Sequence, residues 1–204
     1  PHITDEIKRN IKLLGQKNHY DYVITEIGGT IGDIESAPFM EAIRQMRWEL
    51  GQRAINIHLT YVPYLKAAGE LKTKPTQHSV KELQSIGIQP DILVLRTEKH
   101  LDDNIRKKVA AFCNVDFDCV VQSEDLPSIY EVPVNMQNQG LDVAILRKTG
   151  EPIGKTPELG PWKKFLERRN KATEEVHIGL VGKYDLQDAY KSILECLSQA
   201  GTYN

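Results

Sequence analysis

The stretch DILVLR, residues 91–96, is the clearest strand signal in the chain. Its four central residues are all apolar, so the strand is expected to be covered on both faces, as strands of parallel sheets are. Candidate helices flank it at residues 79–86 and 102–112, and further strands are predicted at 55–62 and 119–122. Strand and helix alternate along the chain, which predicts an α/β fold with a mostly parallel sheet flanked by helices.

A second informative stretch is YVITEIGGTIGDIES, residues 22–36. Residues 22–25 are interpreted as a short buried strand that ends at Glu26, and a glycine-rich loop carries Asp33 and Glu35. In open α/β sheets, ligands bind beyond the carboxyl ends of the strands. Mg²⁺ prefers one or two carboxylates together with phosphate oxygens and water, so this strand end is a candidate magnesium site. The alternative is a polar loop whose acids simply face solvent.

The segment GELKTKPTQHS, residues 69–79, carries two lysines that flank Thr73. In an extended segment Lys72 and Lys74 would point the same way, because side chains alternate with a period of two. Two ammonium groups beside hydroxyls and an amide suit a triphosphate. The alternative is a solvated loop whose lysines only aid solubility. The sequence contains no G-x-x-x-x-G-K-[ST] phosphate loop, so we expect the strand that would carry one to lie upstream of Pro1.

Composition excludes several classes of function. The net charge of −2 over 204 residues gives no reason to expect binding to nucleic acid or to an anionic membrane, and no apolar run approaches membrane-spanning length. Three cysteines without C-x-x-C spacing favour a reduced, cytoplasmic protein over a disulfide scaffold or a zinc site. The sequence also shows no nucleophile elbow and no histidine pair with metal-ligand spacing.

The helical pattern begins at Thr4, which we expect to cap a helix that Gly15 ends, and a second amphipathic helix is predicted at 39–50. The pattern changes after Ile145. We therefore divide the chain into a main domain at 1–147, a connector with a helix at 148–175, and a fresh strand and helix at 176–204. One strand and one helix cannot bury enough apolar surface to stand alone, so this last part is expected to begin a second domain.

Several blocks together closely resemble the CTP synthase family: PHIT at 1–4, EIGGTIGDIES at 26–36, APFMEAIRQM at 37–46, HLTYVPYL at 58–65, GELKTKPTQHSVKELQSIGIQPDIL at 69–93 and FCNV at 112–115. IGLVGKY at 178–184 and DAYKS at 188–192 resemble the start of that family's glutaminase domain. The resemblance implies a phosphate-loop NTPase-like fold, similar to dethiobiotin synthetase. It also implies a ligase that aminates UTP to CTP through a 4-phosphorylated UTP, using ATP and glutamine-derived ammonia.

The resemblance also implies roles for individual residues. Glu26 matches the family's magnesium-binding carboxylate, and Mg²⁺ is the implied cofactor. The residues matched to the UTP site, where CTP also binds as an inhibitor, are Asp33, Ile34, Glu35, Lys72, Thr73, Lys74, Pro75, Thr76, Gln77 and Lys108. Those matched to the ATP site are Glu124, Asp125, Leu126 and Arg96. At Glu124 many family members carry a basic residue instead.

A homotetramer with pyrimidine sites at subunit boundaries is a further implication of the resemblance. The family's phosphate loop, its second magnesium-binding aspartate and its glutaminase nucleophile are missing from this sequence, so residues 1–204 alone are expected to be catalytically silent. Two other functions remain open from the residues themselves. One is another phosphate-loop ligase or a partition-type ATPase, which would not need the 72–77 segment. The other is a non-catalytic module that binds nucleotide and assembles.

Overall fold

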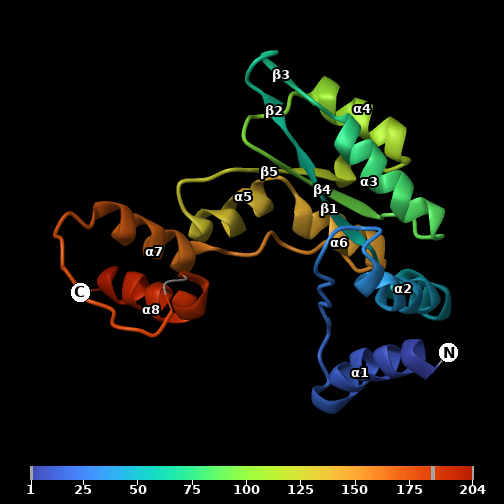
Figure 1. Ribbon diagram of the computed structural model, residues 1–204, viewed down its shortest axis with the longest axis horizontal. Coiled ribbons are helices and arrows are strands. Elements are labelled where there is room, and N and C mark those ends of the chain that lie inside the picture. The colour runs from blue at the N-terminus through green and yellow to red at the C-terminus, as the bar shows by residue number, and fades with distance from the viewer. Residues whose placement is uncertain (1, 185–186, 204) are drawn as a thin grey trace. The chain divides into compact units, whose positions relative to one another are not determined.

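The computed structural model describes residues 2–184 and 187–203. Its chain forms two compact units (Figure 1). The first contains Pro1–Pro127 and Asn135–Gly154, and the second contains Ser128–Val134 and Lys155–Asn204. Among the described residues, no helix is both long and apolar enough to cross a membrane.

The first unit is built on a parallel sheet of three strands, in the order β1 (Ile57–Val62), β4 (Ile92–Thr97) and β5 (Val120–Glu124). The central strand β4 contains the ILVLR part of the DILVLR stretch, and its residues Ile92 to Leu95 are at most 9% exposed. Because successive side chains of a strand point to opposite faces, this burial means that both faces of β4 are covered. The expectation of an α/β fold with a parallel sheet flanked by helices is confirmed.

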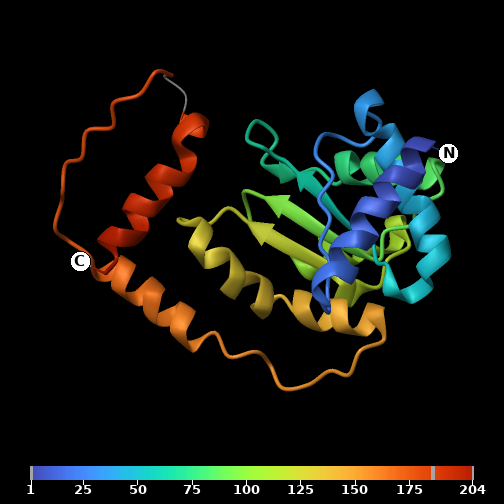
Figure 2. The ribbon, with the colours of Figure 1, turned by 90° about the horizontal axis from the view of Figure 1, so that it is seen from below.

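Helices α3 (Lys74–Ser85) and α4 (Asp103–Cys113) connect the three strands. Both connections step the same way across the sheet, so their right-handed crossovers place both helices on one face, where they lie side by side (Figure 1). Helix α6 (Leu141–Thr149) follows β5 and brings Ala144 into the same core from the other side of the sheet (Figure 2). The core is therefore a sheet with a helix layer on each face.

The remaining elements of the first unit are α1 (His2–Asn18), η1 (Ile34–Ser36), α2 (Ala37–Leu50), η2 (Gly51–Arg53), the short hairpin of β2 (Tyr64–Leu65) and β3 (Glu70–Leu71), and η3 (Phe117–Cys119). Lys8 and Lys12 on α1 bind Glu49 on α2 at 2.8 and 2.5 Å. Contrary to expectation, α1 already begins at His2 and continues through Gly15. A Cβ atom at Gly15 would lie 3.2 Å from Val23 Cγ2, so this glycine admits a close neighbour rather than ending the helix.

Two predicted strands are absent from the described structure. Residues 22–25 are irregular, with Ile24 93% exposed, and residues 177–183 are irregular as well, with Val181 97% exposed. A β-branched sequence makes a strand only where neighbouring strands accept and donate its backbone hydrogen bonds. Neither segment lies in the sheets formed by β1 to β5, so high strand propensity alone does not order it.

The second unit gathers around aromatic side chains. It contains η4 (Ile129–Glu131), part of α5 (Val132–Asn138), α7 (Gly160–Lys171), η5 (Gln187–Tyr190) and α8 (Lys191–Gly201). The rings of Tyr130 and Phe165 meet edge to face at 5.4 Å, and Trp162 Nε1 donates to the Tyr130 carbonyl at 2.7 Å. Glu195 and Gln199 of α8 reach the Tyr130 hydroxyl. Tyr130 thus links α7 and α8.

Candidate functional site

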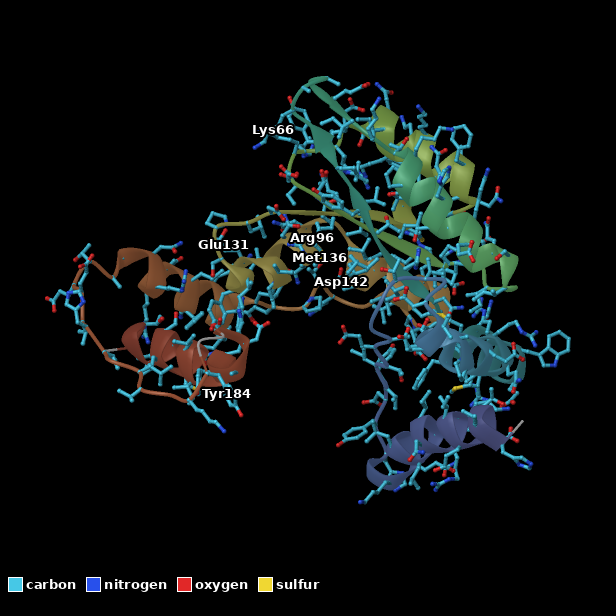
Figure 3. The ribbon with its side chains drawn as sticks, in the orientation of Figure 1. Lys66, Arg96, Glu131, Met136, Asp142 and Tyr184 are labelled. Atoms are coloured by element: carbon cyan, nitrogen blue, oxygen red, sulfur yellow. The ribbon has the colours of Figure 1, made fainter. Side chains whose placement is uncertain are left out.

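The carboxyl edge of the sheet brings together the residues matched to ATP. The strand register places Thr97 of β4 opposite Glu124 of β5, so Arg96 and Asp125 emerge at the same edge. Arg96, labelled in Figure 3, has its Nε 3.6 Å from Asp125 Oδ1, and both side chains are more than half exposed. The Asp125 backbone N–H donates to the Thr97 carbonyl at 3.0 Å. Leu126 follows, half-buried. This is the edge at which open α/β sheets bind ligands.

His100 belongs to the same edge, and sequence reasoning missed it. Its Nδ1 lies 2.6 Å from Glu124 Oε1 and 3.1 Å from Gln122 Nε2. Gln122 is 2% exposed, and its Oε1 accepts a hydrogen bond from the Leu101 N–H at 2.8 Å. No motif marks His100, which follows β4 in an irregular segment. The one sequence feature that points to His100 is its position just beyond the carboxyl end of β4, the strand that carries Arg96.

The carboxyl end of β1 adds a further polar contact at this edge. The Tyr61 hydroxyl donates to Glu98 Oε1 at 2.7 Å, and this hydrogen bond is the main reason that the pKa of Tyr61 is raised. Lys99 Nζ lies 5.8 Å from the centre of the Tyr64 ring. Ends of β1, β4 and β5 therefore all present polar or charged side chains here.

The lysine segment differs from its predicted conformation. Lys74 is the first residue of α3, and Pro75 lies in the first turn, where a missing N–H costs nothing. The segment 72–77 is thus mostly helical, and the expectation that Lys72 and Lys74 share one side of an extended chain is wrong. Lys72 forms an ion pair with Glu70 across one intervening residue, and its backbone N–H donates to the Pro63 carbonyl at 3.0 Å.

Three polar residues of this segment point into the protein. Thr73, Thr76 and Gln77 are all buried. Gln77 Nε2 donates to Thr73 Oγ1 at 3.2 Å. The Thr76 hydroxyl lies 3.1 Å from Thr60 Oγ1 and donates to the Tyr61 carbonyl at 3.2 Å. In this structure these side chains attach the start of α3 to β1, while Lys74 and Pro75 are exposed.

His58 on β1 contacts α3. His58 Nε2 lies 2.8 Å from Ser79 Oγ, which places the ring under α3. Burial lowers the pKa of His58. This histidine is therefore a packing residue between strand and helix.

The acidic loop after α1 has its own local order. The Asp33 carboxylate accepts a hydrogen bond from the Thr30 N–H at 2.7 Å and closes a turn that contains Gly32 at φ 98°. Glu26, Ile34 and Glu35 are exposed. Within the described chain, no three His, Cys, Asp or Glu side chains gather closely enough to hold a metal ion. A single carboxylate at Glu26 suits Mg²⁺ only if phosphate oxygens and water complete its coordination.

Helix α4 carries three consecutive basic residues, Arg106, Lys107 and Lys108, which have different surroundings. Arg106 donates to the Val120 carbonyl at 2.7 Å and lies over the Phe117 ring, so it supports the start of β5. Lys107 also faces the Phe117 ring, at 5.6 Å. Lys108, the member of the cluster matched to the nucleotide site, is exposed.

Comparison with known proteins gives a consistent result. The family model described as "CTP synthase N-terminus" matches residues 1–150. The chain is similar over its whole length to proteins named CTP synthase, with 72% identity to that of Bacteroides thetaiotaomicron, 66% to that of Porphyromonas gingivalis and 56% to that of Flavobacterium psychrophilum. In each case the chain spans 38% of the length of the curated relative.

Proposed function

The chain belongs to the CTP synthase N-terminal family, and from this we propose that it forms part of a ligase that aminates UTP to CTP. In the proposed reaction ATP phosphorylates the 4-oxygen of UTP, and ammonia derived from glutamine displaces that phosphate. The observation that carries the proposal is 72% identity, over the whole chain, to a protein named CTP synthase. Because the identity is this high over the whole chain, we infer that these residues serve the same reaction.

We propose that residues 1–147 are part of the synthetase domain, residues 148–175 a connector, and residues 176–204 the start of a glutaminase domain. The end of the family match at residue 150 supports the first boundary. The phosphate loop and the glutaminase nucleophile would lie in parts of the enzyme outside this sequence. The intact enzyme would be cytoplasmic and homotetrameric, and CTP would inhibit it by binding where UTP binds.

In this proposal the carboxyl edge of β4 and β5 receives ATP. Arg96 would face phosphate oxygens once its weak ion pair with Asp125 opens, because an exposed pair at 3.6 Å costs little to separate. Glu124 and Asp125 would accept hydrogen bonds from the nucleoside, and Leu126 would supply an apolar contact. The fixed register of the two strands keeps these groups together before any ligand arrives.

UTP would lie at the start of α3. Lys74 stands exposed at the first position of that helix, where the helix dipole also favours an anion. Lys72 would exchange the Glu70 carboxylate for a phosphate, which carries more charge. Lys108, Asp33, Ile34 and Glu35 complete the proposed set. Thr73, Thr76 and Gln77 would act by holding the helix start in place, given their buried contacts.

Phosphoryl transfer between two triphosphates gathers roughly seven negative charges in one site. Glu26 would hold Mg²⁺ through its carboxylate, and the bound ion would supply charge neutralisation for the phosphate groups. The lysines and Arg96 would offset the remaining charge, in a geometry set before the reaction begins.

Formation of CTP from UTP, ATP and glutamine by the full-length protein tests the proposal. We expect turnover that depends on all three substrates and on Mg²⁺, and no turnover from residues 1–204 alone. Rejection of UTP in favour of another acceptor by the full-length protein would refute the proposed reaction. CTP formation by residues 1–204 would refute the proposed division of the enzyme.

A further inference from the structure

His100, Gln122 and Glu124 form a three-residue cluster in which one nitrogen atom has two competing partners. His100 Nδ1 lies 2.6 Å from Glu124 Oε1 and 3.1 Å from Gln122 Nε2. A ring nitrogen has one in-plane position, which holds either a proton or a lone pair. To bind the Glu124 carboxylate, Nδ1 must carry a proton. To accept from the Gln122 amide, it must carry a lone pair. Both hydrogen bonds cannot exist at once.

The buried core decides which way Gln122 faces. Its Oε1 accepts a hydrogen bond from the Leu101 backbone N–H at 2.8 Å. The NH₂ group of the amide could not take this place, because it is itself a donor. Gln122 is 2% exposed, so a flipped amide would leave a buried N–H facing another N–H. Gln122 therefore always presents its NH₂ group to His100, and the two more exposed partners, His100 and Glu124, must adjust.

The neighbouring charged groups already have other partners, so they do not relieve this competition. They are Arg96 with Asp125, Glu98 with the Tyr61 hydroxyl, Lys99 with the Tyr64 ring, and Asp102 with the Ile105 N–H. Within the described residues, His100 is the only basic side chain within ion-pairing distance of the Glu124 carboxylate. The proton on His100 Nδ1 thus determines whether Glu124 is held or released.

We propose that His100 is a proton-dependent positioning residue for Glu124. A ring protonated on Nδ1 holds the carboxylate, and a neutral ring that accepts from Gln122 releases it. The released carboxylate is a hydrogen-bond acceptor beside Arg96, at the edge proposed for a nucleotide, and it suits a ligand with an amine donor such as the exocyclic amine of a purine nucleotide. This inference rests on the proposed function, because it assumes that a nucleotide binds at this edge.

The test measures ATP binding by the full-length protein between pH 6 and pH 8. For the wild type we expect affinity to fall by about fivefold to tenfold towards pH 6, as the carboxylate becomes held by the imidazolium. His100→Leu should keep the pH 8 affinity throughout, because nothing then holds Glu124. His100→Asn supplies a permanent neutral donor near the Nδ1 position and should bind weakly throughout. Glu124→Gln should lose the pH dependence as well.

His177→Leu is the matched control, because His177 is exposed in the irregular segment at 177–183. The ATP affinity of this variant should vary with pH as that of the wild type does. Melting temperatures of all variants show whether each is folded. If His100→Leu retains the pH dependence of the wild type, the inference is wrong while the proposed function stands. If no variant and no pH gives ATP binding, the proposed function is wrong and the inference falls with it.

Discussion

Thr76 offers a sharp test of how the lysine segment works. The resemblance assigns it to the UTP site, yet its side chain is fully buried, with Oγ1 3.1 Å from Thr60 Oγ1 and 3.2 Å from the Tyr61 carbonyl. Thr76→Val keeps the shape and removes the hydroxyl. Loss of the Thr76 hydrogen bonds should lower the free energy of unfolding by about 1 kcal/mol. The buried Thr60 hydroxyl also loses this partner, which should lower it by about 1 kcal/mol more.

A loss of about 2 kcal/mol corresponds to a fall in melting temperature of roughly 4–8 °C for a chain of this size. Circular dichroism melts of the wild type, Thr76→Val and Thr76→Ser measure it. Thr76→Ser keeps the hydroxyl and should lose less. Thr156→Val, at an exposed connector position, should melt like the wild type.

UTP titration of the same variants completes the experiment, on full-length protein below its melting range. If Thr76 only anchors α3, Thr76→Val should bind UTP as the wild type does once the folded fraction is taken into account. A variant that melts like the wild type but no longer binds UTP would refute the anchoring role and show that Thr76 contacts the ligand directly.

Three further predictions concern single side chains. Glu26→Gln in the full-length enzyme should lower CTP formation from ammonia by about 10²–10³-fold because a magnesium ligand is lost, while glutamine hydrolysis persists; an unchanged rate would remove Glu26 from the site. Lys72→Ala should raise the KM for UTP by about tenfold, whereas Lys66→Ala, a lysine exposed between β2 and β3, should not; equal effects would argue against a specific phosphate contact. Burial lowers the pKa of His58, so the unfolded chain takes up the proton first and the free energy of unfolding should fall as pH drops below about 6.5. Urea unfolding of His58→Gln should show a smaller fall over that range, and an identical pH profile would contradict the burial of this ring.

Local sequence was sufficient for the central strand, because a run of four apolar residues between polar ones admits few other structures. It also predicted α1 to α4, where amphipathic periodicity reports which face is buried, but not α6. The helix predicted at 102–112 is α4, which begins one residue later because Asp102 is its N-cap. Asp102 stands before an amphipathic run, and its side chain accepts from the Ile105 N–H as a helix cap should.

Sequence alone failed where the outcome depends on distant partners. Residues 22–25 and 177–183 have the composition of strands but remain irregular, since strand formation requires backbone partners that propensity cannot supply. The extended conformation predicted around Lys72 and Lys74 is wrong because Pro75 lies in the first turn of α3, where its neighbours Thr76 and Gln77 are buried.

The residues proposed for nucleotide binding divide in the same way. Family motifs select Glu26, Lys72 and Arg96 as chemical types, and these motifs are readable in the sequence. Only the tertiary structure reveals that Lys72 pairs with Glu70, that Thr76 is buried, and that His100 lies between Gln122 and Glu124. The sequence determined which functional groups are present and where helices and the central strand form, because those depend on local pattern. The parallel register of β4 and β5 decided which groups meet, because it joins residues more than twenty positions apart in the chain.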